Sequence, residues 1–309
     1  QEDRGPLTQP VRRRLDTEMV RRGLSVSRAR AQELVSEGSV LVGGAVATKA
    51  SRLVHQGESV SVSAPPPRYV SRGGVKLEAA LDRFALDAKG MRAFDAGLST
   101  GGFTDCLLQR GASSVMAVDV GYGQVHEKLR TDRRVEIRER VNIRHLESGL
   151  GPFDLVVADL SFISLTKVAP VLVELARPNG LLVVLVKPQF EAGRADVSKG
   201  RGVIRDPDLW HRAVADVALS FQRCGAAIMG SMVSPLTGHD GNSEFFLSLV
   251  APDGVGHGGR SSLGPSMSPE EAARGAVADA EGRESVRSGS PHTTGSAGPK
   301  LDEESDQWQ

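Results

Sequence analysis

A chain of 309 residues, 39% of them hydrophobic, is long enough for one to three domains with ordinary apolar cores. Its formal net charge is zero, yet residues 1–76 carry 13 basic and 7 acidic side chains, whereas residues 251–309 carry 5 and 10. A basic head suits a polyanion such as nucleic acid, and a solvated helix face explains the same charges equally well.

The two cysteines, Cys106 and Cys224, are far apart, and neither belongs to a CxxC pattern or another metal-ligand spacing. This spacing excludes a structural zinc site and indicates reduced core cysteines in a cytoplasmic protein, so we expect no metal. No apolar run approaches the roughly 18 residues that span a bilayer, and the first residues contain no apolar signal-peptide segment. We therefore expect no membrane association.

Composition divides the chain into segments. We expect a disordered N-terminus over 1–10, a small head domain over 11–63, a proline-rich linker over 64–70, a body over 71–251 and a mostly disordered acidic tail over 252–309. The linker contains three consecutive prolines, which form a stiff extended break. The tail is rich in Gly, Ser and Pro and poor in aromatic residues, so burial offsets little of its entropy. Within it, the sequence SPEEAA at 268–273 predicts a short helix.

The body alternates apolar strands with helical stretches. The predicted strands are 92–96, 115–120, 135–139, 154–160, 181–187, 227–233 and 244–250. The predicted helices are 73–86, 102–110, 122–130, 164–177 and 207–224. This alternation predicts an α/β fold with a Rossmann-like, doubly wound, mainly parallel sheet of seven strands.

A glycine-rich turn, DAGLSTGGF, follows the first of these strands and begins with Asp95. Strand, glycine-rich turn and helix allow the backbone to approach a ligand closely, but neither the P-loop nor the GxGxxG spacing is present. Asp119 ends the next strand, where an acid can accept hydrogen bonds from a ribose. These features together fit an adenosine-type ligand without a pyrophosphate, such as S-adenosylmethionine; the alternative is that Asp119 is only a turn residue.

Two further strands end on charged residues, Asp159 and Lys187. The carboxyl ends of strands in an open α/β sheet face the ligand crevice, so we expect an acid and an amine there. A surface salt bridge is the alternative, but a charge directly after a fully apolar run is costly without a partner, which favours a functional pair. Lys76 and Glu244, near the first helix and the last strand of the body, are each ordinary surface residues when considered alone.

Taken together, the motifs SRGGVKL, DAGLSTGGFTD, VDVGYGQ, ADLSFISL, VKPQFEAG, GVIRDP and GNSEFF resemble the TlyA family of ribosomal RNA 2′-O-methyltransferases, historically called hemolysins. The resemblance runs from about residue 11 to residue 250. The motifs RLD, GLSVSRARA and GSVLVGG in the head resemble an S4 RNA-binding domain, with a tight hairpin turn at Gly43-Gly44. Two departures are Leu98, where the family usually has a small residue, and Tyr69, where some relatives have tryptophan.

The resemblance implies a specific set of site residues. Its FtsJ-type catalytic tetrad falls on Lys76, Asp159, Lys187 and Glu244, with Lys187 the leading candidate for the base. The implied cofactor is S-adenosylmethionine, bound by Asp95, Gly97, Ser99, Gly101, Phe103, Asp119 and Asn142. The implied RNA contacts are Arg14, Arg28, Arg30, Lys49 and Arg72, because arginine and lysine on such a surface bind RNA phosphates and shape.

The implied partners are ribosomal RNA and ribosomal subunits, and we expect a monomer. The implied reaction is 2′-O-methylation of cytidines in 16S or 23S rRNA, or both; the sequence does not identify the nucleotides. Two alternatives stay open. One is a non-catalytic rRNA-binding protein whose body is only a scaffold, and the other is a hemolytic activity, which the absence of an apolar span leaves at most indirect.

Overall fold

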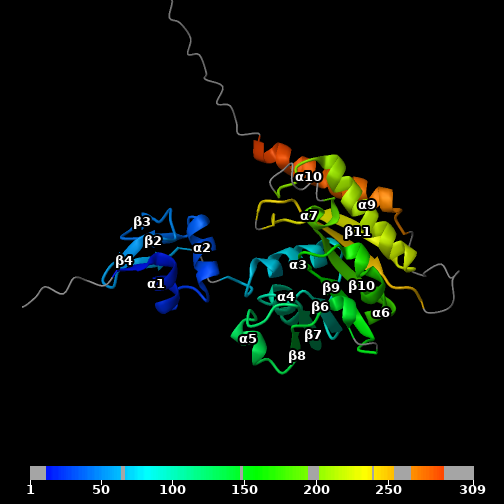
Figure 1. Cartoon of the computed structure of the whole chain (residues 1–309), viewed down its shortest axis with the longest axis horizontal. Coiled ribbons are helices and arrows are strands. Elements are labelled where there is room, and N and C mark those ends of the chain that lie inside the picture. Colours follow the sequence, from blue (N-terminus) through cyan, green and yellow to red (C-terminus); the bar gives the residue numbers. More distant parts are fainter. Residues whose placement is uncertain are drawn as a thin grey trace, which may run out of the picture. The chain divides into compact units, whose positions relative to one another are not determined.

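The computed structural model describes residues 12–63, 67–146, 149–193, 202–238, 240–253 and 266–288, with the side chains of residues 284–288 excepted. The chain divides into two compact units: Gln1–Asp159 with Leu175–Arg177, and Leu160–Glu174 with Pro178–Gln309. The first unit contains the head and the first strands of the body (Figure 1).

The head packs two short helices against small strands. In chain order it contains β1 (Arg12–Arg14), α1 (Leu15–Arg21), α2 (Arg28–Ser36), β2 (Val40–Val42), β3 (Ala45–Val46), β4 (Leu53–His55) and β5 (Val60–Val62). Strand β1 pairs with β4, and β3, β2 and β5 form a second small sheet. Leu15 and Met19 of α1 are buried against Leu34 and Val40. The β2–β3 turn has left-handed φ angles of 61° and 82° at Gly43 and Gly44, which confirms the predicted tight turn.

The first part of the body alternates helices and parallel strands. It contains α3 (Arg72–Arg83), β6 (Arg92–Ala96), α4 (Gly102–Gln109), β7 (Ser114–Asp119), α5 (Glu127–Arg130), β8 (Val135–Glu139), the 3₁₀ helix η1 (Ile143–His145) and β9 (Phe153–Ala158). Strand β6 pairs in parallel with both β7 and β9, and β7 pairs in parallel with β8. The buried, β-branched and aromatic side chains of these strands explain why the apolar runs form a sheet covered on both faces.

The second unit supplies the remaining strands. Its elements are η2 (Leu165–Lys167), α6 (Ala169–Leu175), β10 (Ala176–Val186), α7 (Pro188–Glu191), α9 (Pro207–Arg223), β11 (Ala227–Val233), β12 (Phe245–Val250) and α10 (Pro269–Ser288). The last residue of α6 and the first two of β10, Leu175–Arg177, belong to the first unit. Strand β12 is antiparallel to both β10 and β11. The sheet has seven strands in the order β11-β12-β10-β9-β6-β7-β8, which confirms the predicted mainly parallel α/β fold.

The elements differ from the predictions at several ends. The helix expected over 122–130 is confined to α5: Gly123 takes a left-handed φ of 74°, and His126 is extended and caps the helix by accepting the Lys128 N–H at 3.2 Å. The stretch expected as one helix over 164–177 is divided between η2 and α6, and β10 already begins at Ala176. These are shifts of boundaries that leave the order of elements unchanged.

The tail contains a longer helix than the sequence predicted. Instead of a short helix near 268–273, α10 extends over Pro269–Ser288. Its N-terminus is capped reciprocally: the Glu271 N–H donates to Ser268 Oγ at 3.2 Å, and the Ser268 N–H donates to Glu271 Oε2 at 2.7 Å. A face of small residues, including Ala272 and Ala276, is buried where α10 contacts α9 and β11. Burial of this face against the body stabilises a helix that composition alone did not favour. Residues 254–265 and 289–309 of the tail lie outside the described residues.

Candidate functional site

The turn after β6 adopts a backbone that few side chains tolerate. Gly97, Ser99 and Gly101 have φ angles of 96°, 48° and 103°. A Cβ at Gly101 would overlap the side chain of Leu129, so glycine is required there by space as well as by backbone conformation. The N–H groups of Gly97 and Leu98 donate to the Val118 carbonyl, at 3.0 and 3.1 Å, so the turn runs close to the end of β7.

Asp119, at the end of β7, fastens this turn. Its Oδ2 accepts the Ser99 N–H at 2.7 Å, and its Oδ1 accepts the Gly121 N–H at 2.6 Å. The carboxylate therefore holds the turn after β6 beside the end of β7. The side chain is partly exposed, so it also remains within reach of a ligand. This contact brings together two of the residues that the sequence assigned to the cofactor.

Asp95, at the end of β6, is a buried acid with one satisfied oxygen. Its side chain is 0% exposed; Oδ2 accepts a hydrogen bond from Thr104 Oγ1 at 2.6 Å, and Oδ1 has no hydrogen-bond partner among the described residues. Burial raises the pKa of Asp95 to about 7, and the negative charges of Asp159 and Asp119 contribute in the same direction. The structure thus collects these three acids around the turn, a setting that favours a cationic ligand.

Asp159 directly follows β9, and its N–H donates to the Ala96 carbonyl at 2.9 Å. The parallel pairing of β9 with β6 places it beside Asp95. In the same unit, Lys76 is buried on α3, whose start is pressed against α4: a Cβ at Gly102 would overlap the Ser71 hydroxyl. Lys76 and Asp159 are therefore both held by rigid elements, as chemistry at a fixed position requires.

In the second unit, Lys187 follows β10 and is also buried. Its Nζ donates to Ser161 Oγ at 3.1 Å and lies 5.9 Å from the centre of the Phe190 ring. The Phe162 ring lies 5.2 Å from that of Phe190, yet Phe162 is 92% exposed and has a left-handed φ of 65°. An exposed aromatic ring on a strained backbone beside a buried lysine is a candidate binding surface that sequence reasoning missed.

Glu191 ties the segment of Phe162 to the turn after Lys187. Its Oε2 accepts the Ser164 hydroxyl at 2.5 Å, and its Oε1 accepts the Leu165 N–H at 2.9 Å. Burial raises the pKa of Glu191, while the hydrogen bonds from Ser164 and Leu165 act in the opposite direction. Residues 161–165 and 187–191 are consequently joined at both ends. The only signal for this contact in the sequence is the glutamate at the end of the motif KPQFE.

Glu244, the last of the proposed catalytic residues, is buried just before β12. Its carbonyl accepts the Ser234 N–H at 2.8 Å, and its carboxylate lies so close to Gly238 that a Cβ there would come within 2.6 Å of Oε1. Nearby, Asn242 accepts the Ile204 N–H at 2.8 Å through Oδ1. Ser234 and Gly238, from the segment between β11 and β12, therefore lie against Glu244.

Three residues assigned from the resemblance have other contacts. Phe103 is buried, with its ring against Gly73 at the start of α3. Asn142 uses its side-chain oxygen to cap η1, where it accepts the Arg144 N–H at 3.0 Å. Arg72 lies in the first turn of α3 and is partly buried. A contact of these residues with cofactor or RNA remains a prediction.

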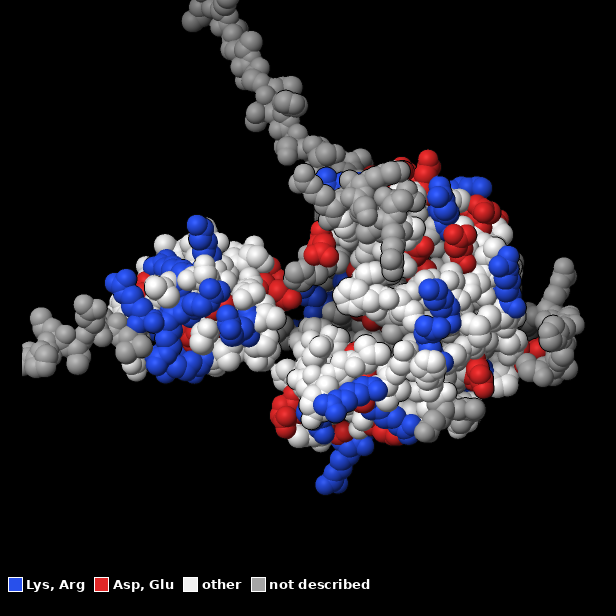
Figure 2. Space-filling model, viewed as in Figure 1, with Lys and Arg blue, Asp and Glu red and all other residues white. Residues whose placement is uncertain are grey.

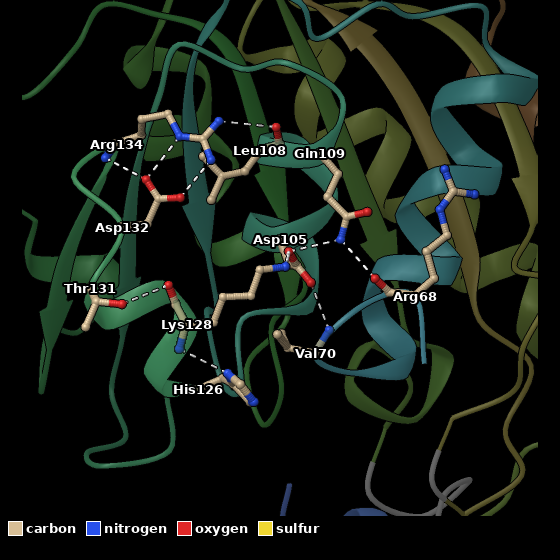
Figure 3. A network of polar contacts seen from close by, with 10 residues as sticks. All are labelled: Arg68, Val70, Asp105, Leu108, Gln109, His126, Lys128, Thr131, Asp132 and Arg134. Atoms are coloured by element: carbon tan, nitrogen blue, oxygen red, sulfur yellow. Dashed lines mark hydrogen bonds and ion pairs between the residues drawn. The ribbon is translucent and has the colours of Figure 1, made fainter. Parts of the chain in front are cut away.

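A polar network at the start of the body was not expected from the sequence (Figure 3). The buried carboxylate of Asp105 in α4 accepts hydrogen bonds from the Val70 N–H at 2.9 Å, from Gln109 at 3.1 Å and from Lys128 at 2.8 Å. Gln109 also donates to the Arg68 carbonyl at 2.9 Å. The chain that leaves the linker is therefore fastened to α4 and α5.

Basic side chains gather over the head in Figure 2. Arg14 and Arg28 both pair with Asp16, and Arg30 pairs with Glu33 on its own helix and with Glu37, which directly follows that helix. Lys49 is exposed in the loop between β3 and β4. Four of the five predicted RNA contacts thus lie on the head, and three of them are engaged by acids of the head.

No helix in the described ranges is both long and apolar enough to cross a membrane. Nor do the described residues contain a group of three or more His, Cys, Asp or Glu side chains placed to hold a metal ion.

Comparison with known proteins gives consistent matches. Residues 69–251 match the FtsJ-like methyltransferase family and residues 13–60 match the S4 domain. The 16S/23S rRNA (cytidine-2′-O)-methyltransferase TlyA of Mycobacterium tuberculosis is 49% identical over 241 residues, which cover 77% of this chain and 90% of that protein. Hemolysin A of Brachyspira hyodysenteriae is 37% identical over 240 residues, covering 77% of this chain and 99% of that protein. A solved structure from Streptococcus thermophilus that carries the name hemolysin is 34% identical, covers 91% of this chain and 99% of its own, and has a TM-score of 0.69.

Proposed function

Because the chain belongs to the TlyA family, in which an S4 domain precedes an FtsJ-like methyltransferase domain, we propose that it methylates the 2′-oxygen of cytidines in ribosomal RNA. The family match covers the whole body, and the S4 match indicates an RNA substrate. The finer elements of the proposal are cytidine as the nucleoside, 16S rRNA, 23S rRNA or both as the substrate, and ribosomal subunits as the particles that are bound.

The residues around the turn after β6 fit S-adenosylmethionine, the cofactor of this family. The observation that supports the fit is the buried Asp95 Oδ1, which has no partner among the described residues and therefore suits a cationic ligand. We assign the binding of the cofactor to Asp95, Asp119 and the backbone of Gly97, Ser99 and Gly101. When bound, the cofactor supplies an electrophilic methyl group on a positively charged sulfur.

The chemistry then requires a group that takes the proton from the ribose 2′-hydroxyl, since a neutral hydroxyl is a poor nucleophile. We assign this role to Lys187, whose buried Nζ is oriented by the Ser161 hydroxyl. Asp159 orients the amine and complements positive charge near Asp95. Lys76 and Glu244, buried on α3 and before β12, position the ribose.

Phe162 is well suited to receive the base of the target nucleotide. Unpaired RNA bases stack on exposed aromatic rings, a contact worth about 1–3 kcal/mol per base. The ring is almost fully exposed and is backed by Phe190, the neighbour of Lys187 in the turn after β10. A base stacked there would hold its nucleotide beside the strand end that carries the lysine.

Docking of the RNA is assigned to the head and to Arg72 at the start of the body. We further propose that the chain acts as a monomer, without a metal ion, in the cytoplasm where ribosomal subunits are found. Hemolysin is a name that some relatives carry; the methyltransferase family match over 69–251 gives the name no functional support.

The observation that carries the proposal is that Asp159 and Lys187 directly follow β9 and β10, two neighbouring strands of the sheet, in a chain of this family. The test is transfer of labelled methyl groups from S-adenosylmethionine to purified ribosomal subunits, with the modified 2′-oxygens mapped on 16S and 23S rRNA. Lys187→Ala and Asp159→Ala should each abolish transfer, and Lys89→Ala, an exposed lysine between α3 and β6, should not. Wild-type rates with either site variant would overturn the catalytic assignment. Binding of rRNA without any transfer by the wild-type chain would favour the non-catalytic alternative.

A further inference from the structure

Two arginines from different elements of the head converge on one buried acid. Arg14 ends β1 and Arg28 begins α2, and both donate to Asp16 Oδ2, at 2.9 and 3.3 Å. Arg14 also donates through Nε to Asp16 Oδ1 at 3.1 Å, so its guanidinium holds the carboxylate through two nitrogen atoms. The shared acid fixes the two guanidinium groups side by side.

Asp16 itself is rigidly held. It is 0% exposed, and besides the arginines it accepts the Thr17 N–H at 2.8 Å and Gln32 Nε2 at 2.9 Å. The pKa of Asp16 lies well below its usual value, first because Arg14 donates to it and further because Gln32, Arg28 and Thr17 do. The carboxylate is therefore ionised throughout the neutral range.

The two arginines, in contrast, are open to the surroundings. Their side chains are 45% and 57% exposed. Each guanidinium carries five N–H donors, and the bonds to Asp16 use only two nitrogens of Arg14 and one of Arg28. Two positive groups around one acid keep the cluster cationic, and donors remain for a ligand that is anionic and rich in oxygen.

We propose that Asp16 is a positioning residue that holds Arg14 and Arg28 as a preformed pair for the phosphates of the RNA backbone. This inference rests on the proposed function, because it assumes that the head docks RNA. Its physical basis is that a long side chain loses rotamer freedom when it binds, and a side chain already held by an acid loses less. An acidic residue would thus increase the affinity of the head for an acidic polymer.

A simpler interpretation predicts the opposite sign. If Asp16 only neutralised the arginines, removing its charge would strengthen the positive potential of the head and tighten the binding of RNA. The direction of the effect therefore decides between positioning and neutralisation.

The test is the affinity of the full chain for protein-free 16S rRNA, measured at several salt concentrations. Asp16→Asn should weaken binding by about tenfold, since two arginines lose their support. Glu58→Gln is the matched control, because it removes one negative charge from the head at a residue that pairs with Arg52, which is not a predicted RNA contact. The control should bind as tightly as the wild-type chain or slightly more tightly. Asp16→Asn binding at wild-type affinity or better would overturn the inference while leaving the proposed function intact, whereas a wild-type chain that does not bind rRNA would remove the premise of both.

Two further variants separate positioning from damage to the fold. In an Arg14→Gln/Arg28→Gln background, Asp16→Asn should cause no further loss of affinity; a full additional loss would show that Asp16 acts elsewhere and overturn the inference. Arg28→Lys keeps the charge at a residue that is more than half exposed, and therefore tests the pair even if Asp16→Asn fails to fold. It should weaken binding several-fold because lysine lacks the planar fork, and unchanged affinity would contradict the pair.

Discussion

Asp16 in the head and Asp95 at the end of β6 are both acids with 0% exposed surface, but their surroundings move their pKa values in opposite directions. Asp16 receives donors on both oxygens, from two arginines, a glutamine and a backbone N–H, and its pKa is lowered. Asp95 receives Thr104 on one oxygen only, and burial raises its pKa to about 7. The loss of exposed surface therefore does not by itself decide the charge of an acid: hydrogen bonds led by that from Arg14 lower the pKa of Asp16, whereas desolvation raises that of Asp95.

The difference also distinguishes two ways of binding a ligand. The head satisfies its acid internally and uses it to support the groups that meet RNA. The turn after β6 leaves Asp95 Oδ1 without a partner among the described residues, so that a ligand can supply one. A fully bonded acid supports neighbouring groups, whereas a partly bonded one marks the place of a missing partner.

The largest expected effect is a loss of turnover without a loss of RNA binding, which would distinguish chemistry in the body from docking by the head. Lys187→Met keeps the length of the side chain and removes the amine, so we expect turnover to fall at least about 10³-fold. The affinities for rRNA and S-adenosylmethionine should stay within a few-fold of wild type. Methyl transfer under single-turnover conditions and separate binding titrations measure both, and an equal loss in all three would remove the distinction between the two regions.

The next effect concerns Asp95, whose Oδ1 has no partner among the described residues. Asp95→Asn keeps an acceptor for Thr104 but cannot carry a negative charge, and we expect S-adenosylmethionine to bind about 10- to 100-fold more weakly.

Because the folded pKa of Asp95 lies above its ordinary value of 3.8, the wild-type chain loses stability from this group as the pH rises through about 7. The variant avoids this loss, so at pH 8 its melting temperature should equal or exceed that of wild type. Thermal melts at pH 5 and pH 8 check the sign, and a variant less stable only at pH 8 would contradict it.

A pH titration tests the same contrast without mutation. The ionised form of Asp95 is the one that favours a cationic ligand, so the affinity of the wild-type chain for S-adenosylmethionine should fall about tenfold from pH 8 to pH 6. Asp16 stays ionised over this range, and binding of rRNA by the head should not change with protonation of that residue. Calorimetric titrations at several pH values measure the first effect, and Asp95→Asn should lose this dependence.

The smallest effect concerns support within the body. Glu191→Ala releases Ser164 and Leu165 and should lower turnover by about tenfold or less, because Phe162 and Ser161 lose a fixed backbone. Glu191→Gln should restore most of the rate, since its amide can accept the Leu165 N–H and donate to the Ser164 hydroxyl. Kinetics with saturating rRNA compare the two variants. Equal rates for alanine and glutamine would mean that the hydrogen bonds do not position the segment.

The sequence predicted most of the fold because its signals are local. Apolar runs such as LLVVLV, the glycines of DAGLSTGG and the Gly43-Gly44 turn each depend on a few neighbouring residues, and the structure confirms the strands and turns that they indicate. The ends of elements were less predictable. The helix α10 extends far beyond its capping signal because its face of small residues is buried against α9 and β11, a contact between segments far apart in the chain.

By itself, the sequence determined the order of the strands along the chain, the acids and amines that follow them, and a basic head followed by a linker. Only the tertiary structure decided which of those charges are satisfied. It joined Asp16 to Arg14 and Arg28, left Asp95 Oδ1 without a partner among the described residues, and exposed Phe162 on a left-handed backbone. The physical reason is that secondary structure follows from local patterns, whereas the state of a buried charge depends on donors that residues distant in sequence bring to it.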